Sequence, residues 1–530
     1  VGQSDHSDCA PCMLKTLSSH WPVGALPRAA IASGALVVGL ILKKLLVKPK
    51  PPKSRFIENK LQVPDDDEVQ KTRKLAAEKA EVLLAELLEK AKAFAADPVP
   101  GYPTSLLLKG DGPLLYLGAP GLAFAFIHVY DNGPPGLRGR RELLDTSRAV
   151  LERSSKIISG INATCVLPKV MSLTPYAWGF HDVMLALVSD RLGTPVSPPV
   201  KLEGLSCSGD PMPSEDPLWG RGGFFFGSAW ANAVLGSVVP EESIRAALAA
   251  SLESGREQAR RFAASKYASK STPPPPLLYA NFPGAMFQAY MPVLSAHLSI
   301  VKKVLVRALI NASLYGARWF GVPHEMKFDG GLGHGLAGNL WGFMLHWHLL
   351  SSKDQADVGD TLRYLMKAVD MKTGKCEDGV PGLTSLMGKD DTRPFVHWCR
   401  GSPSLAFSLA RGYEVLGDES MLGAAKAAAG DVWERGILLK GNGTCHGVAG
   451  SAYVLLYMYR VTKDAEYLRK AVALTAATWD DSITSQQATP DNPYSLFEGK
   501  AGTLCLYSDV ASDPLTAAFP GFQIPPTPRR

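Results

Sequence analysis

Residues 447–479 read GVAGSAYVLLYMYRVTKDAEYLRKAVALTAATW, a pattern of two helices joined by a short turn. Gly447 and Gly450 stand three residues apart and open an apolar run with helical spacing. A Thr-Lys-Asp turn follows, and then a second run that places its polar residues on one helical face. The stretch therefore predicts a helical hairpin whose first helix is the more apolar of the two.

The same pattern recurs from about residue 105 onward. A glycine, two residues and a second glycine open an apolar run at five places, and two weaker copies carry serine or aspartate at the second position. The seven pairs are Gly118/Gly121, Gly179/Asp182, Gly220/Gly223, Gly335/Gly338, Gly401/Ser404, Gly447/Gly450 and Gly499/Gly502. Each loop has to turn sharply into a helix, often through positive φ and with close backbone approach, which explains the glycines.

Alternating strand patterns are rare, so the repeat predicts an all-α fold. The spacing of the copies is irregular, which argues against a simple open solenoid. We therefore expect a closed α/α toroid of about seven helical hairpins over residues 105–530. Inner helices follow the glycine turns, outer helices lie between them, and an insertion occupies about 240–325. Residues 61–104 predict an N-terminal helical extension that docks on this toroid, with acidic residues at its start.

Residues 1–60 form a separate tail that contains the apolar stretch 22–42 and a basic linker. The uncharged part, 29–42, would span roughly 21 Å as a helix, less than the about 30 Å of a bilayer core. Membrane anchor, targeting segment and apolar extension all remain open interpretations. The basic residues that follow favour an anchor with the toroid in the cytosol. The sequon at Asn442 also favours a cytoplasmic location, because a glycan there would block the neighbouring Cys445.

Composition limits the function classes. The 530 residues are 46% hydrophobic and 20% charged, as expected for a globular chain with a sizeable core. The formal charge of +6 is small for this length and argues against nucleic acid as a partner. Eight cysteines are ordinary usage, so a reducing compartment is expected and paired Cys/His positions become metal candidates.

Chemically versatile residues occupy equivalent places in several repeats. His334, His446 and Glu498 each immediately precede the first glycine of a pair, Cys445 precedes His446, and Cys399 lies two residues before Gly401. Equivalent positions of a toroid lie at the same end of the barrel. We therefore expect these side chains to converge although they are far apart in sequence.

Cys399, Cys445 and His446 form a candidate zinc site. Two thiolates and one imidazole suit Zn²⁺, and three protein ligands leave the fourth tetrahedral position open, as in catalytic sites. A closed structural site with Cys376 or Cys505 as fourth ligand is the alternative, and free core cysteines are another.

Four words of the sequence together resemble the lanthionine synthetase C-like family. They are GGLGHGLAG at 330–338, HWCRGSPS at 397–404, GNGTCHGVAG at 441–450 and SLFEGKAG at 495–502, and the resemblance extends over about 105–522. It implies a toroid of seven helical hairpins. It also implies that the zinc ligands are Cys399, Cys445 and His446 and that the active-site histidine is His334.

The resemblance implies a chemistry as well. In bacterial members zinc holds a peptide thiolate that adds to dehydroalanine or dehydrobutyrine, and eukaryotic members resemble glutathione-binding proteins. We expect zinc-dependent addition of glutathione to dehydroamino acids in polypeptides, since no dedicated precursor-peptide domain is evident. His334 would protonate the enolate that the addition leaves, or take the proton of the incoming thiol.

Three more residues are candidate glutathione contacts. Lys440, which eukaryotic relatives also carry, would hold a carboxylate or be a solvated surface lysine. Arg400 stands where those relatives usually have histidine, and a guanidinium binds carboxylates but transfers no protons. Glu498 would orient a ligand or cap a loop, whereas His397 and Trp398 are interpreted as packing residues.

Two other functions compete with this one. A non-catalytic zinc- and glutathione-binding signalling adaptor at a membrane would suit the N-terminal segment and Arg400. A glycosidase on a toroid would need paired carboxylates across a cleft, and Glu498 is the single acid that the repeat places there.

Overall fold

The computed structural model describes residues 54–97, 115–164, 178–194, 215–218, 220–264, 273–279, 329–377, 380–381 and 395–524. The chain forms two compact units, Val1–Arg55 and Phe56–Arg530, and every described helix and strand lies in the second. Within the described ranges, no helix is long and apolar enough to cross a membrane. The apolar stretch 22–42 lies outside them, as does most of the expected insertion at 240–325.

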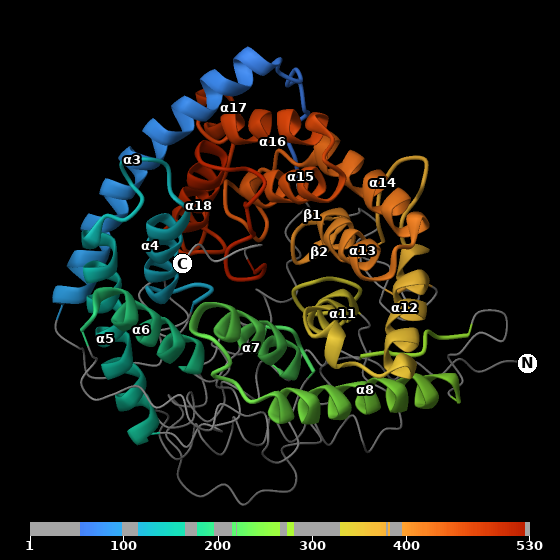
Figure 1. Ribbon diagram of the computed structural model, residues 1–530. Coiled ribbons are helices and arrows are strands. Elements are labelled where there is room, and N and C mark those ends of the chain that lie inside the picture. The colour runs from blue at the N-terminus through green and yellow to red at the C-terminus, as the bar shows by residue number, and fades with distance from the viewer. Residues whose placement is uncertain are drawn as a thin grey trace, which may run out of the picture. The chain divides into compact units, whose positions relative to one another are not determined.

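Seven helices of the described part form an inner ring, and the ring closes on itself (Figure 1). Each of them contacts the next, and the last contacts the first. In order they are α4 (Pro120–Asn132), α6 (Trp178–Leu192), α7 (Arg221–Leu235), α11 (Leu336–Leu345), α13 (Ser402–Leu416), α15 (Val448–Thr462) and α18 (Lys500–Ala511). These are the helices that the glycine turns predicted, and the all-α toroid is confirmed.

A second layer of helices packs outside this ring. It contains α5 (Arg141–Thr164), α8 (Glu241–Ala263), α12 (Ser352–Met366), α14 (Glu419–Arg435) and α16 (Ala465–Ala477), with the short η3 (Trp347–Leu349) and α17 (Asp481–Thr484) between elements. Three of these helices, α12, α14 and α16, follow an aspartate or serine whose side chain caps the first turn, which satisfies N–H groups that solvent would otherwise have to bind.

The N-terminal helix α3 (Asp66–Ala96) is the outer partner of the last inner helix. It packs along α18 and also contacts α16 and α5, so it covers the seam where the ring closes between α18 and α4 (Figure 1). Its apolar side, including Leu84, Leu87 and Phe94, is buried. Ahead of α3, the Ile57 N–H donates to Ile437 O at 2.7 Å. The segment before the helix thereby runs beside the loop that leads to Cys445.

Where the structure describes the residues before an inner helix, a tight turn folds back against the first residues of that helix. A Cβ added at Gly338 would lie 2.1 Å from Leu332 O, six residues earlier, which is too close for any side chain. The same relation to a carbonyl oxygen six residues back holds at Gly121, Gly450 and Gly502. The turn also serves the helix end, because Leu336 N–H donates to Asp329 O at 2.8 Å. Close approach therefore explains the second glycine in these four pairs.

The first glycine of each pair differs from expectation in its conformation. Gly335 and Gly447 have extended φ values of −134° and −139°, which any residue adopts, so positive φ is not the reason for glycine there. Gly401 does have φ +86°, and its Cβ would lie 1.9 Å from Phe395 O. The turn before α13 is therefore the one of these three that needs glycine on both grounds.

The centre of the ring is filled by the C-terminal segment that follows α18. Phe519 stacks on Trp398 with ring centroids 5.0 Å apart, and Phe522 stacks on Trp341 at 4.7 Å. Phe522 also lies edge-on to Trp398 at 4.9 Å. This aromatic cluster joins residues from α11, from the turn before α13 and from the C-terminal segment. It therefore packs the C-terminal segment against the turns at the N-termini of the inner helices.

Candidate active site and metal centre

Cys399 lies in the two-residue turn of a small hairpin. Strands β1 (Val396–His397) and β2 (Arg400–Gly401) pair antiparallel, with His397 opposite Arg400. The Trp398 side chain is buried, and the backbone N–H of Trp398 donates to Cys445 O at 2.7 Å. On the other side, the Gly333 N–H donates to Cys399 O at 3.1 Å. Backbone hydrogen bonds therefore tie the Cys399 turn to the turns before α15 and α11.

The turn before α15 supplies Cys445 and His446. The Cys445 N–H donates to Phe497 O at 2.8 Å, which links this turn to the next one, before α18. The three turns thus lie side by side, as equivalent positions in a toroid should. The sulfur atoms of Cys399 and Cys445 and a ring nitrogen of His446 all lie within 4.8 Å of one another.

This donor set fits Zn²⁺. Around a zinc ion with Zn–S bonds of about 2.3 Å, tetrahedral ligand atoms lie about 3.7 Å apart, so small shifts would let all three bind one ion. Among the described residues this is the one such group, and it holds no fourth ligand. Cys376 bonds to Gly374 O and Cys505 is buried within α18, away from the group.

Charge within the thiol pair is uneven. Hydrogen bonds from Cys445 and from the His397 and His446 rings hold the pKa of Cys399 well below its ordinary value, although burial opposes them. Burial raises the pKa of Cys445 well above its ordinary value, and the neighbouring Cys399 adds to this effect. Cys399 is therefore the sulfur that carries negative charge most readily, which is what metal binding requires.

His334 lies in the turn before α11 and has a carboxylate partner. Its Nδ1–H donates to Asp216 Oδ2 at 3.0 Å, and a Cβ at the preceding Gly333 would lie 2.7 Å from Cys399 Cβ. Burial lowers the pKa of His334, but the Asp216 carboxylate outweighs it, with help from Asp329, and raises that pKa to about 9. His334 is therefore protonated at neutral pH and is poised to donate a proton.

Asp216 is the residue that the sequence reasoning missed. It is buried, it accepts the Leu218 N–H at 2.8 Å through its other oxygen, and it lies four residues before Gly220. The turn before α7 therefore contributes to the same site as the other turns. Its position inside a glycine-repeat turn was the available signal, since an acid within such a turn is expected to face the shared end of the ring.

The predicted glutathione contacts lie around this centre in different ways. The Arg400 guanidinium lies 3.4 Å from Asp329 Oδ2 and over the Phe395 ring, and 37% of its side chain is exposed. Lys440 is exposed, in the loop that leads to Cys445. Glu498 Oε1 lies 3.8 Å from His446 Nε2, and its Oε2 accepts from Asn492 at 2.8 Å. All three therefore belong to turns that reach the metal group.

His397 contributes more than the packing that we expected from it. Its ring bonds to the Cys399 sulfur and lies 5.5 Å from the His446 ring, centroid to centroid. Two of the three candidate ligands therefore contact this imidazole. Such outer partners orient metal ligands and affect metal affinity.

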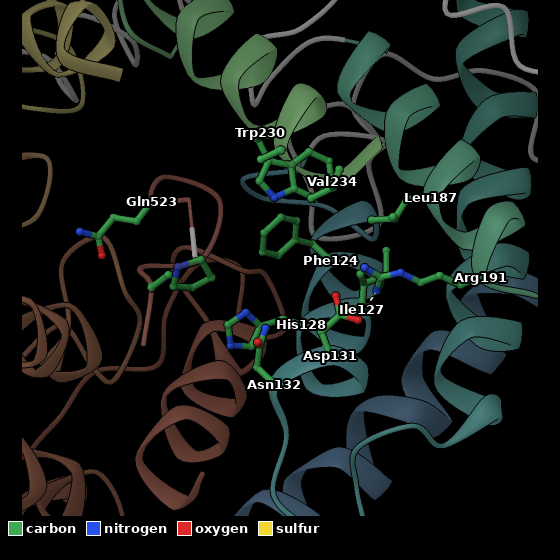
Figure 2. A pocket seen from close by; sticks show the side chains of 13 residues that line it. Phe124, Ile127, His128, Asp131, Asn132, Leu187, Arg191, Trp230, Val234 and Gln523 are labelled. Atoms are coloured by element: carbon green, nitrogen blue, oxygen red, sulfur yellow. Dashed lines mark hydrogen bonds and ion pairs between the residues drawn. The ribbon is translucent and has the colours of Figure 1, made fainter. Parts of the chain in front are cut away.

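A separate cavity lies between three inner helices, away from the turns that hold the metal group. Figure 2 shows residues of α4, α6 and α7 around it, among them His128, Asp131, Arg191 and Trp230. Its volume is about 40 Å³, which holds a few water molecules rather than a substrate. His128 bonds to the buried Asp509 at 2.7 Å and Arg191 pairs with Asp131, so these charges are already matched. We interpret this cavity as structural.

The helical toroid gathers two cysteines, a histidine and an Asp–His pair at one end of its inner ring. Apart from the aspartate, this is the arrangement that the resemblance to the lanthionine synthetase C-like family led us to expect. Comparison with known proteins agrees with it. A family model described as lanthionine synthetase C-like protein matches residues 287–524. LanC-like protein GCL1 of Arabidopsis thaliana is 29% identical over 439 residues, which cover 79% of this chain and 84% of the relative.

Two further proteins are similar. Glutathione S-transferase LANCL1 of Danio rerio is 32% identical over 197 residues, or 37% of this chain and 45% of the relative. Among solved structures, nisin cyclase has a TM-score of 0.47 and 13% identity, covering 82% of this chain and 93% of its own. Residues 287–524 thus match the lanthionine synthetase C-like family, and the resemblance expected from the four sequence words is confirmed.

Proposed function

We propose that this protein is a zinc-dependent enzyme that adds the thiol of glutathione to dehydroalanine or dehydrobutyrine residues in polypeptides. The observation that carries the proposal is the convergence of Cys399, Cys445 and His446 beside the Asp216–His334 pair. The name of the zebrafish relative, a glutathione S-transferase, supports glutathione as the thiol.

The chemistry needs a thiolate and an acid. A free thiol with a pKa of about 8.5 is mostly protonated at neutral pH. Zinc on Cys399, Cys445 and His446 would supply an open position that binds the incoming sulfur as thiolate. The thiol proton leaves to solvent, a C–S bond forms at the β-carbon, and the alkene electron pair moves toward the carbonyl as an enolate.

His334 is assigned the protonation of that enolate. Its proton on the ring nitrogen opposite Asp216 would pass to the α-carbon, and solvent would return one to the imidazole. Asp216 is a positioning residue, because it fixes Nδ1–H and stabilises the charged ring without reaching the substrate itself. Arg400 and Lys440 are assigned to the two carboxylates of glutathione, which they would hold on the Cys399 side of the centre.

Thioether formation on a defined peptide tests the proposal. A dehydroalanine peptide is incubated with glutathione and the zinc-loaded protein, and a mass increase of one glutathione is measured. His334→Ala should lose thioether formation while it keeps zinc and glutathione binding. If the wild-type protein binds zinc and glutathione but forms no thioether, the proposed activity is wrong and the non-catalytic adaptor is the better interpretation.

The membrane anchor at 22–42 remains a proposal from the sequence. Fractionation of cells that express the chain with and without residues 1–60 tests it. Loss of membrane association on deletion is the expected result, and an unchanged distribution would remove the anchor.

A further inference from the structure

A groove opens beside the metal group, on the side of His446. It lies between the loop Gly441–Gly443, the segment 484–493 and the start of α18, and its volume is about 260 Å³. Glu498 lines its inner end, 3.8 Å from His446 Nε2, and is held in place by Asn492. We call it the Glu498 groove. It approaches the lower end of the size range of ligand pockets, about 300 Å³.

The groove and the opposite side of the centre differ in charge. Arg400 follows Cys399 directly, and its guanidinium lies 3.4 Å from Asp329 and is 37% exposed, so a partly exposed cationic group lies on the Cys399 side. Among the described residues that line the groove, Lys500 is the single basic one, and its Nζ is paired with Glu86 at 2.6 Å. A tripeptide with two carboxylates would meet Glu498 there and no unpaired cation, so the groove disfavours glutathione.

The lining suits an uncharged stretch of polypeptide instead. Threonine, glutamine, asparagine and proline side chains and the backbone of three glycines form most of it, and these offer short hydrogen-bonding groups and flat apolar faces. Asn442 is one of these residues, and its side-chain N–H donates to Thr478 O at 2.9 Å, which fixes that side chain in the wall of the groove.

We propose that the Glu498 groove binds the acceptor polypeptide, in extended form, next to its dehydroamino acid. The inference rests on the proposed function and adds to it a place for each substrate. Glutathione would approach from the Cys399 side, where Arg400 lies, and the acceptor from the His446 side, where Glu498 lies, so the two reacting atoms meet over the metal group. Acceptor preference would then follow from the groove, with acidic flanking residues disfavoured by Glu498.

Blocking the groove tests this assignment. Thr489 and Ala488 are exposed residues of its outer wall, and Thr489→Trp and Ala488→Trp would each fill it. Ser485→Trp is the matched control, because Ser485 is exposed in the same segment but does not line the groove. The probe is a fluorescein-labelled peptide of neutral residues with one dehydroalanine, and its binding to zinc-loaded protein is measured by anisotropy.

We expect the peptide Kd to rise about tenfold or more in both groove variants, which is a loss of about 1.4 kcal/mol. Zinc content, glutathione Kd and the Ser485→Trp protein should match wild type. A peptide Kd unchanged in both variants, or a rise in glutathione Kd instead, would overturn the assignment. Groove-dependent peptide binding without thioether formation would support the groove and remove the proposed activity.

Discussion

Replacing Asp216 by asparagine removes a charge from the site with little change in shape. The carboxylate lies 3.0 Å from His334 Nδ1 and is buried. An amide oxygen can still accept the Leu218 N–H, which Asp216 Oδ1 accepts at 2.8 Å, so the turn before α7 should keep its fold. The expected loss is the stabilisation of protonated His334.

The size of that loss follows from the pKa of His334. A rise from the ordinary 6.5 to about 9 corresponds to about 3 kcal/mol at about 1.4 kcal/mol per unit. The His334 side chain is 30% exposed, so water screens part of this, and we expect about half of it to depend on Asp216. The pKa of His334 should therefore fall by about one to two units in Asp216→Asn.

Two measurements report this fall. NMR titration of ¹³C-labelled histidine follows the ring directly, and the alkaline limb of kcat/KM should move to lower pH by the same amount. A raised histidine pKa stabilises the folded state fully below about pH 6.5, and this contribution is lost as pH rises through about 9. The variant should therefore be less stable than wild type at pH 6 and about equally stable at pH 10.

A control separates this charge effect from a general one. Asp182→Asn removes a half-buried carboxylate 3.4 Å from His181, outside the site, and should leave the titration of His334 and the kcat/KM profile unchanged. If Asp216→Asn kept the wild-type pKa of His334 and the same alkaline limb, the assignment of Asp216 as the group that charges His334 would be refuted.

Four further changes have defined outcomes. Elemental analysis should find one zinc per chain in wild type and none in Cys399→Ala, and a variant that keeps zinc would contradict the ligand set. His397→Ala should weaken zinc binding about tenfold in chelator competition, with His397→Gln restoring much of it through an amide N–H to the sulfur. His128→Ala leaves the Asp509 carboxylate buried without its cation and should cost about 3 kcal/mol of unfolding free energy. Burial lowers the pKa of His128, but Asp509 outweighs burial and raises it, so the cost should shrink as pH rises above the pKa of His128. Gly401→Ala should cost about 2 kcal/mol or more in denaturant unfolding, since φ is +86° and the Cβ would strike Phe395 O.

The repeat of paired glycines was enough to predict the ring. Glycine is required wherever a turn closes against the helix that follows it, as between Gly338 and Leu332, and so the pattern is visible in a single chain. Cys399, Cys445, His446 and His334 could be selected for the same reason, because the glycines mark equivalent turns and the selected residue types carry the chemistry. Local sequence therefore encodes the inner helices, their order and the residues at their N-termini.

The contacts between turns depended on the tertiary structure. Asp216 and His334 are 118 residues apart and meet because the turns before α7 and α11 are neighbours in a closed ring, a relation with no local signature. The contact between the His397 and His446 rings and the position of Glu498 in its groove likewise have no local signature. Nor does the position of α3, which packs outside α18 and completes the outer layer. Helix formation and turn geometry act over a few residues and can be read along the chain. Electrostatic pairing, metal-ligand spacing and groove shape depend on distances between segments, which exist only once the ring has closed.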